Sequence, residues 1–163
     1  MDISKIIIRE LKEDEHAFLR QMFHMAVYVP EGEKPLPENI IDQPELSKYI
    51  ENWGRKGDYC LVAELENKKA GAVWCRSFDE KSRGYGFVDN HIPELTIAVL
   101  EPYRNMGIGG ILLQKFFQLL KDSGFQSISL SVDRRNPAVN LYLRSGFRIL
   151  MSNRNDHIML REL

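Results

Sequence analysis

The sequence predicts an α/β protein in which helices are layered on a sheet. Two apolar helical segments, 109–122 and 136–144, each lie between segments with strand character. A third observation is the order strand, glycine-rich turn and helix within 94–110. Because a helix that connects two strands allows them to run parallel, we expect the strands flanking each helix to be parallel neighbours.

Composition indicates a globular protein without an extended charged surface. The 163 residues include 22 basic and 23 acidic side chains, with a formal net charge of -1, and 44% are hydrophobic. This balance argues against a general nucleic-acid or membrane surface. No apolar run approaches the roughly 20 residues that span a bilayer, and the start does not follow a signal-peptide pattern. We expect one domain over 1–163, a cytoplasmic location, and a monomer or homodimer.

The two cysteines do not indicate a metal site. Cys60 and Cys75 lie in apolar, strand-like runs and lack the spacing of metal ligands. We therefore expect buried, reduced thiols and no bound metal.

The first third of the chain is predicted to form a strand, two helices and a proline-rich loop. β-branched residues predict a strand over 5–10, and an apolar stripe predicts a helix over 13–28 that ends before Pro30. Residues 30–44 contain four of the seven prolines, which is typical of a loop. A helical pattern returns over 45–52.

The remaining strands are indicated by apolar runs that alternate or are rich in β-branched residues. They are 58–66 and 70–78, joined as a hairpin through 67–69, then 95–100, 126–132, 147–152 and 157–160. The polar segment 79–91 is interpreted as a loop, with a short strand over 86–88 left open.

The glycine-rich turn has the features of an anion site. Gly107, Gly109 and Gly110 stand where a strand and turn lead into a strongly apolar helix. The first backbone N–H groups of a helix have no intrahelical acceptor, and the helix dipole places positive charge there. Glycines let a phosphate approach the backbone closely. The segment 104–110 therefore predicts a phosphate-bearing ligand.

Three motifs together carry a family resemblance. They are Arg104-x-x-Gly107-x-Gly109, Ser129-Leu-Ser-Val-Asp133, and Asn136-x-Ala138-x-x-Leu141-Tyr142-x-x-x-Gly146-Phe147. In this order and spacing the chain resembles the GNAT superfamily of acyl-CoA-dependent N-acyltransferases, most specifically over 94–150. The resemblance implies a mixed, largely antiparallel sheet of six to seven strands, splayed between the fourth and fifth, with about four helices on its faces. A dinucleotide-binding fold fits less well, because the third glycine of its fingerprint is missing.

The resemblance implies acetyl-CoA as co-substrate. Backbone amides over 105–110 would hold its pyrophosphate, with Arg104 at the mouth of the turn, and the strand before the turn would pair with its pantetheine arm. The amide of Val99 would polarise the thioester carbonyl. The matched positions are Ile97, Ala98, Val99, Arg104, Asn105, Met106, Gly107, Ile108, Gly109, Gly110 and Asn136. Asn136 also suits a helix N-cap.

Two residues are candidates for catalysis. Tyr142 matches the family's tyrosine and would protonate the departing thiolate; from the residues alone, a core tyrosine on an amphipathic helix is the alternative. Glu94, at the head of its strand, would deprotonate the attacking amine; a solvated strand-end carboxylate is the alternative. A water wire would serve the same purpose.

The acceptor site is the least defined part of the prediction. Tyr28, Glu31, Glu33 and Trp53 would line a site for a cationic amine through charge pairing and cation–π contact. The alternative is a loop whose polar groups face water.

The sequence thus predicts an acyl-CoA-dependent N-acetyltransferase that acts on a primary amine, in a small molecule or a peptide, by direct attack in a ternary complex. The alternative is an acyl-CoA-binding regulatory or sensor module with the same fold and no turnover.

Overall fold

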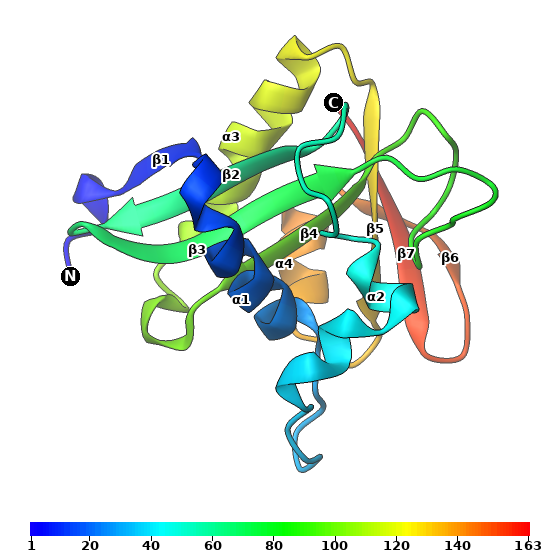
Figure 1. Ribbon diagram of the computed structural model, residues 1–163, viewed down its shortest axis with the longest axis horizontal. Helices are drawn as coiled ribbons and strands as arrows, with labels where there is room; N and C mark the ends of the chain where they lie inside the picture. Colours follow the sequence, from blue (N-terminus) through cyan, green and yellow to red (C-terminus); the bar gives the residue numbers. More distant parts are fainter.

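The computed structural model describes all 163 residues and contains one seven-stranded sheet with helices on both faces (Figure 1). The strand order is β1-β2-β3-β4-β5-β7-β6. The strands are β1 (Ile7–Glu10), β2 (Tyr59–Leu65), β3 (Lys68–Arg76), β4 (Glu94–Val99), β5 (Ser127–Asp133), β6 (Arg148–Ser152) and β7 (Asp156–Glu162). The helices are α1 (His16–Ala26), α2 (Pro44–Ser47), α3 (Ile108–Asp122) and α4 (Ala138–Arg144). None of these helices is long and apolar enough to cross a membrane.

The mixed, largely antiparallel sheet predicted from the resemblance is confirmed. Only β4 and β5 are parallel, and every other pair of neighbouring strands is antiparallel. The tight β2–β3 hairpin is also present, and its connection is formed by Glu66 and Asn67, both with positive φ. Two central residues with positive φ are typical of a type I′ turn, whose twist matches that of the flanking strands.

The expectation of parallel neighbours holds around α3 and is wrong around α4. β5 and β6 flank α4 in the chain, but β7 lies between them and pairs antiparallel with both. The burial of the two strands explains this order. All five residues of β6 are exposed, whereas β7 buries Met159 and Leu160. The strand with buried apolar residues therefore takes the interior position, and β6 forms the edge.

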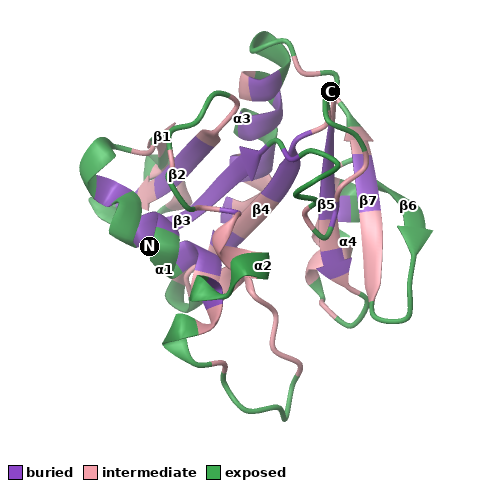
Figure 2. Ribbon diagram, turned by 45° about the vertical axis from the view of Figure 1, so that its right-hand side comes forward, coloured by how far each residue is buried: buried purple, intermediate pink, exposed green.

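Two hydrophobic clusters separate the helices onto opposite faces of the sheet. On one face, α1 packs Leu19 and Met22 against Val62 and Trp74 of the central strands. On the other face, α3 and α4 pack against the alternate residues of the same strands, together with β5. β2 and β3 are consequently buried on both faces, as the purple segments of Figure 2 show.

The helix predicted over 45–52 is shorter than expected. The α-helical part ends at Ser47, and turns follow. The side chain of Arg76 explains the end of the helix, because its guanidinium donates hydrogen bonds to the carbonyls of Lys48 and Glu51 at 2.9 and 2.7 Å. The same guanidinium forms a buried ion pair with Asp58 at 2.7 Å. The short strand left open at 86–88 does not form.

A charged cluster joins the start of the chain to the sheet. The guanidinium of Arg9 donates two hydrogen bonds of 2.8 Å to the carboxylate of Glu15 and also contacts Glu64 at 2.9 Å. The bond from Arg9 is the main reason that the pKa of Glu15 falls from 4.5 to about 2. This geometry fixes β1 against the first turn before α1.

We expect Glu15→Gln to lower the free energy of unfolding at pH 7 by about 1–2 kcal/mol, since it removes the charge that pairs with Arg9, whose side chain is still partly exposed to solvent. The pKa of Glu15 is lower in the folded protein, so its stabilisation is full above pH 4.5 and is lost as the pH falls towards 2. Urea unfolding of both proteins between pH 7 and pH 2.5 measures the difference, with exposed Glu13→Gln as the control. A difference that does not shrink at low pH would contradict this explanation.

Candidate active site

The parallel strands β4 and β5 separate soon after they meet. Their register contains one pair, Glu94 opposite Ser129, and beyond it the strands diverge towards their carboxyl ends (Figure 2). Leu100 donates its N–H to Ala70 of β3 at 2.8 Å. Because alternate residues of a strand bond to opposite sides, Ile97 and Val99 direct their backbone groups into the space between β4 and β5.

The start of α3 presents a row of free backbone donors to this space. None of the backbone N–H groups of 105–110 has an acceptor within the chain. Gly107 has φ 84° and Asn105 has φ 61°, so the chain turns through left-handed conformations just before the helix begins. Together with the positive end of the helix dipole, these donors form a site for an anionic group.

Arg104 fixes the end of β4 to this turn. Its Nε donates to the carbonyl of Val99 at 3.0 Å. The carbonyl of Val99 is therefore engaged within the chain, whereas its N–H remains directed into the gap. The rest of the Arg104 side chain lines the cavity beside the free donors.

α4 forms the opposite wall. The Oδ1 of Asn136 accepts the N–H of Ala138 at 2.9 Å, so this side chain caps the start of α4 as its residue type predicts. Tyr142 is 8% exposed and packs edge-to-face against Phe147, with ring centroids 5.8 Å apart. Burial raises the pKa of Tyr142, so the phenol keeps its proton at neutral pH.

These walls enclose one cavity of about 640 Å³. It contains most of the residues predicted from the sequence, namely Tyr28, Ile97, Ala98, Val99, Arg104, Asn105, Gly107, Ile108, Gly109, Gly110, Asn136 and Tyr142. Five predicted residues, Glu31, Glu33, Trp53, Glu94 and Met106, are not among its lining residues.

The sequence patterns assigned no role in the site to eight further lining residues, which are Met25, Ala26, Tyr103, Pro137, Ala138, Asn140, Leu141 and Arg144. Helical spacing could have found Ala138, since it precedes Tyr142 by four residues and therefore lies on the same face of α4. Met25 and Ala26 had no such signal, because α1 is remote from the motifs in the sequence.

Glu94 lies at the vertex where β4 and β5 meet, on the face covered by α1 and α2. It is 3% exposed. Burial raises its pKa from 4.5 to about 7, and hydrogen bonds from the Tyr49 hydroxyl and the Gly86 N–H act in the opposite direction. Glu94 is three residues from Ile97, about 10 Å along an extended strand. It is therefore a buried titrating group close to, but outside, the cavity.

The residues predicted for the acceptor site are not brought together. Tyr28 lines the cavity and donates its hydroxyl to the carbonyl of Arg135 at 3.3 Å. Glu33 pairs with the side chain of Arg135 at 3.7 Å, while Glu31 is exposed. Trp53 lies under the guanidinium of Arg76, 5.4 Å from its ring centroid, so a cation of the chain itself occupies that ring.

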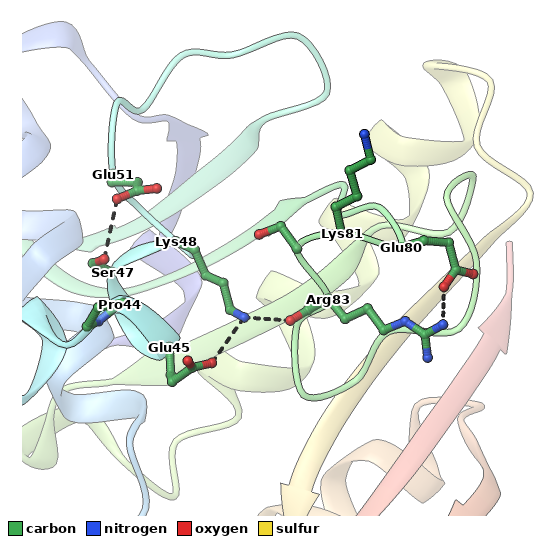
Figure 3. A pocket seen from close by; sticks show the side chains of 9 residues that line it. Pro44, Glu45, Ser47, Lys48, Glu51, Glu80, Lys81 and Arg83 are labelled. Atoms are coloured by element: carbon green, nitrogen blue, oxygen red, sulfur yellow. Dashed lines mark hydrogen bonds and ion pairs between the residues drawn. The ribbon is translucent and has the colours of Figure 1, made fainter.

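A second cavity, of about 550 Å³, lies between α2 and the loop after β3. All of its lining residues except Pro44 are polar or charged, and they include Lys48, Ser82 and Arg83. Lys48 bridges the two walls, because its Nζ donates to the carbonyl of Arg83 at 2.6 Å and contacts Glu45 at 3.5 Å (Figure 3). No group of three or more His, Cys, Asp or Glu side chains could hold a metal ion.

Comparison with known protein families decides the classification. Residues 17–147 match the model of the acetyltransferase (GNAT) family. The chain belongs to the GNAT family. The expectation from the sequence motifs is thereby confirmed.

Two curated relatives show the same relationship at the level of sequence. An N-alpha-acetyltransferase of Sulfolobus acidocaldarius is 34% identical over 110 residues, which are 61% of this chain and 62% of that protein. The N-alpha-acetyltransferase MAK3 of Arabidopsis thaliana is 26% identical over 145 residues, covering 83% of this GNAT chain and 71% of the relative. The match thus spans less than two thirds of the Sulfolobus protein.

Solved structures share the fold. A GCN5-related N-acetyltransferase from Kribbella flavida aligns with a TM-score of 0.71 at 19% identity, over 99% of this chain and all of the other. The PaiA N-acetyltransferase of Thermoplasma acidophilum, solved in complex with coenzyme A, aligns over the whole of both chains with a TM-score of 0.68 at 19% identity. At this level of identity, the similarity establishes the GNAT fold.

Proposed function

We propose that this GNAT protein transfers an acetyl group from acetyl-CoA to a primary amine. The observation that carries the proposal is the row of free backbone N–H groups over 105–110, which opens onto the same cavity as Tyr142. One cavity therefore offers an anion site at one end and a proton donor at the other.

The chemistry of the cavity fits acetyl-CoA. The free N–H groups at the start of α3 suit a pyrophosphate, which takes many donors. The free N–H groups of Ile97 and Val99 suit the amides of the pantetheine arm, in the manner of an added strand. Asn136 lies on the opposite wall. The Thermoplasma protein of the same fold is known in complex with coenzyme A, which supports this assignment.

The residues of the chain then divide the proton transfers between them. Acetyl-CoA supplies an acyl thioester. The amine loses one proton, which Glu94 accepts through water, given its distance from the cavity. As the bond from nitrogen to carbon forms and the carbon–sulfur bond breaks, Tyr142 gives its phenolic proton to the sulfur and regains one from the nitrogen. The cavity lining contains no cysteine, which favours direct attack over an acyl-enzyme.

The acceptor that we propose is the α-amine of a peptide or protein. Two relatives of this chain are named N-alpha-acetyltransferases. Met25, Ala26 and Tyr28 form a largely apolar wall from the end of α1, suited to the side chain of a first residue. Glu31 would attract a positively charged amine from solvent.

A transfer assay tests this function. Purified protein is mixed with acetyl-CoA and with matched acceptors: peptides with a free α-amine and no lysine, the same peptides with a blocked α-amine and one lysine, and small amines. We expect thiol release with the first set, at a kcat/KM at least about 10-fold above the other two, and acetyl groups on the α-amine by mass spectrometry. A preference for small amines or lysine would contradict the proposed acceptor. Coenzyme A binding without transfer to any amine would contradict the proposed enzymatic activity.

A further inference from the structure

The buried carboxylate of Glu94 has one satisfied oxygen and one free oxygen. Oε1 accepts the Tyr49 hydroxyl at 2.6 Å and the N–H of Gly86 at 2.8 Å. Oε2 is buried and has no hydrogen-bond partner. An unpaired buried carboxylate oxygen is costly, because the lost hydration is not replaced. Its presence here calls for a functional reason.

Tyr49 is held firmly in place to make this contact. Its ring packs between Phe23 and Phe78, with centroids 5.5 and 5.0 Å away. Its hydroxyl also accepts the N–H of Tyr85 at 2.7 Å. Arg76 anchors the backbone on both sides of it through the carbonyls of Lys48 and Glu51. The phenol is therefore oriented by the structure rather than free to rotate away.

The backbone of the loop opposite packs closely against Oε2. A Cβ added at Gly84 would lie 1.9 Å from Oε2, and one added at Gly86 would lie 2.6 Å from the backbone of Leu130. Any side chain at these two positions would therefore displace the carboxylate or the loop. Gly84 is only half-buried, and the preceding residue, Arg83, lines the polar cavity of Figure 3. Gly84 is thus a partly solvent-exposed residue that packs directly against Oε2.

We propose that Tyr49 is a positioning residue for acetyl transfer, whose hydroxyl keeps Glu94 a carboxylate with Oε2 free to take the proton of the acceptor amine through water. The proposal rests on the proposed function, in which Glu94 is the base. In this step the ammonium gives one proton to water, water gives one to Oε2, and the neutral carboxyl later releases it to solvent. Tyr49 keeps its own proton throughout.

Burial raises the pKa of Glu94, and among the surrounding side chains Tyr49 makes the hydrogen bond that lowers it. Lys48 favours the carboxylate by its charge. Arg76 stands opposite Glu94 on β3, but its guanidinium is paired with Asp58. From the remaining elements come the Gly86 and Tyr85 amides and the Ser129 hydroxyl, which donates to the Gly86 carbonyl. With these contributions, the pKa of Glu94 is about 7, which is suited to a base at neutral pH.

The pH dependence of Tyr49→Phe tests the proposal. Loss of a hydrogen bond that favours the charged form raises the pKa of Glu94, so the acid limb of kcat/KM should move upwards by about one pH unit. Well above that limb, activity should return to within about 2-fold of wild type, which a merely structural defect would not produce. Tyr59→Phe is the matched control, since its ring packs on Phe125 and its hydroxyl has no partner in the chain. Its acid limb should stay in place.

A direct titration of Glu94 separates the proposal from the proposed function. Protein labelled with ¹³C at glutamate carboxyls is followed by NMR from pH 5 to 9, with Glu94→Gln to assign the signal. The proposal predicts a midpoint near 7 that rises by about one unit in Tyr49→Phe, together with the acid limb. An unchanged midpoint would overturn it. So would a risen midpoint with an unmoved acid limb, because Glu94 would then not be the base. If wild-type protein acetylates no amine, the proposed function and the role of Tyr49 in it both fail. The titration then still measures how the hydrogen bond from Tyr49 changes the pKa of Glu94.

Discussion

Gly109→Glu is expected to abolish acetyl-CoA binding without unfolding the protein. The glutamate would place a negative charge among the free N–H groups at the start of α3, where the pyrophosphate is proposed to lie. Two like charges about 5 Å apart at an effective dielectric constant of about 20 repel each other by about 3 kcal/mol, which weakens binding by about 100-fold or more. A Cβ at this position also lies 3.1 Å from Cδ2 of Leu141, so the longer side chain projects into a crowded site.

The fold should survive this substitution. Gly109 lies in the first turn of α3 and does not have a positive φ. Glutamate is a better helix former than glycine, and an acidic residue near a helix N-terminus is favourable. Isothermal titration with acetyl-CoA measures the loss, and thermal unfolding checks the fold. Gln114→Glu is the control, because it adds the same charge at an exposed position of α3. Binding retained by Gly109→Glu would show that the anion site lies elsewhere.

Tyr142→Phe is expected to lower kcat by about 100- to 10,000-fold, the usual range for loss of a general acid. The hydroxyl faces the cavity and has no acceptor within the chain, so it is available to the leaving sulfur. The ring should remain packed on Phe147, because the substitution removes only the oxygen. We therefore expect the Kd for acetyl-CoA to change by less than about 3-fold.

Stopped-flow or steady-state thiol release gives kcat, and titration gives the Kd. Tyr59→Phe again serves as the control for loss of a phenol outside the cavity. Equal losses in kcat and in affinity would indicate that Tyr142 only shapes the cavity. An unchanged kcat would remove Tyr142 from the proton-transfer step altogether.

The parts of the site that sequence could predict are those made from contiguous chain. The anion site at 105–110 uses backbone N–H groups, and glycines at a strand–helix turn are enough to indicate them. Tyr142 and Asn136 belong to one helix and its cap, so their spacing is also visible in the sequence. The cavity brings both segments together because α3 and α4 pack on the same face of the sheet.

The surroundings of Glu94 could not be predicted, because they are assembled from remote segments. Tyr49 is 45 residues before Glu94, in a segment whose pattern indicated only a helix. Trp53 illustrates the reverse case. Its aromatic ring suggested a site for a cationic substrate, but Arg76 of β3 fills it. Side chains that form such contacts have no fixed spacing in the sequence, because the tertiary fold determines which of them meet.

The order of the last three strands in the sheet could not be predicted fully from the sequence. The helix–strand alternation correctly indicated that β4 and β5 are parallel neighbours, because α3 connects them directly. The same rule is wrong for β5 and β6, since β7 pairs with both of them and lies between them. A rule that considers only a helix and the two strands beside it in the sequence cannot predict that a later strand pairs with the same edge of β5.

The free amides at the start of α3 are proposed to hold the pyrophosphate of acetyl-CoA in the cavity that ends at Tyr142. The most direct measurement is a ¹H–¹⁵N NMR titration of the wild-type protein with acetyl-CoA. Since these N–H groups would gain charged acceptors, we predict that the amide protons of 105–110 move downfield and show the largest shifts in the chain. Binding of acetyl-CoA that leaves the chemical shifts of these amides unchanged, with the largest shifts elsewhere in the chain, would contradict this assignment of the pyrophosphate site.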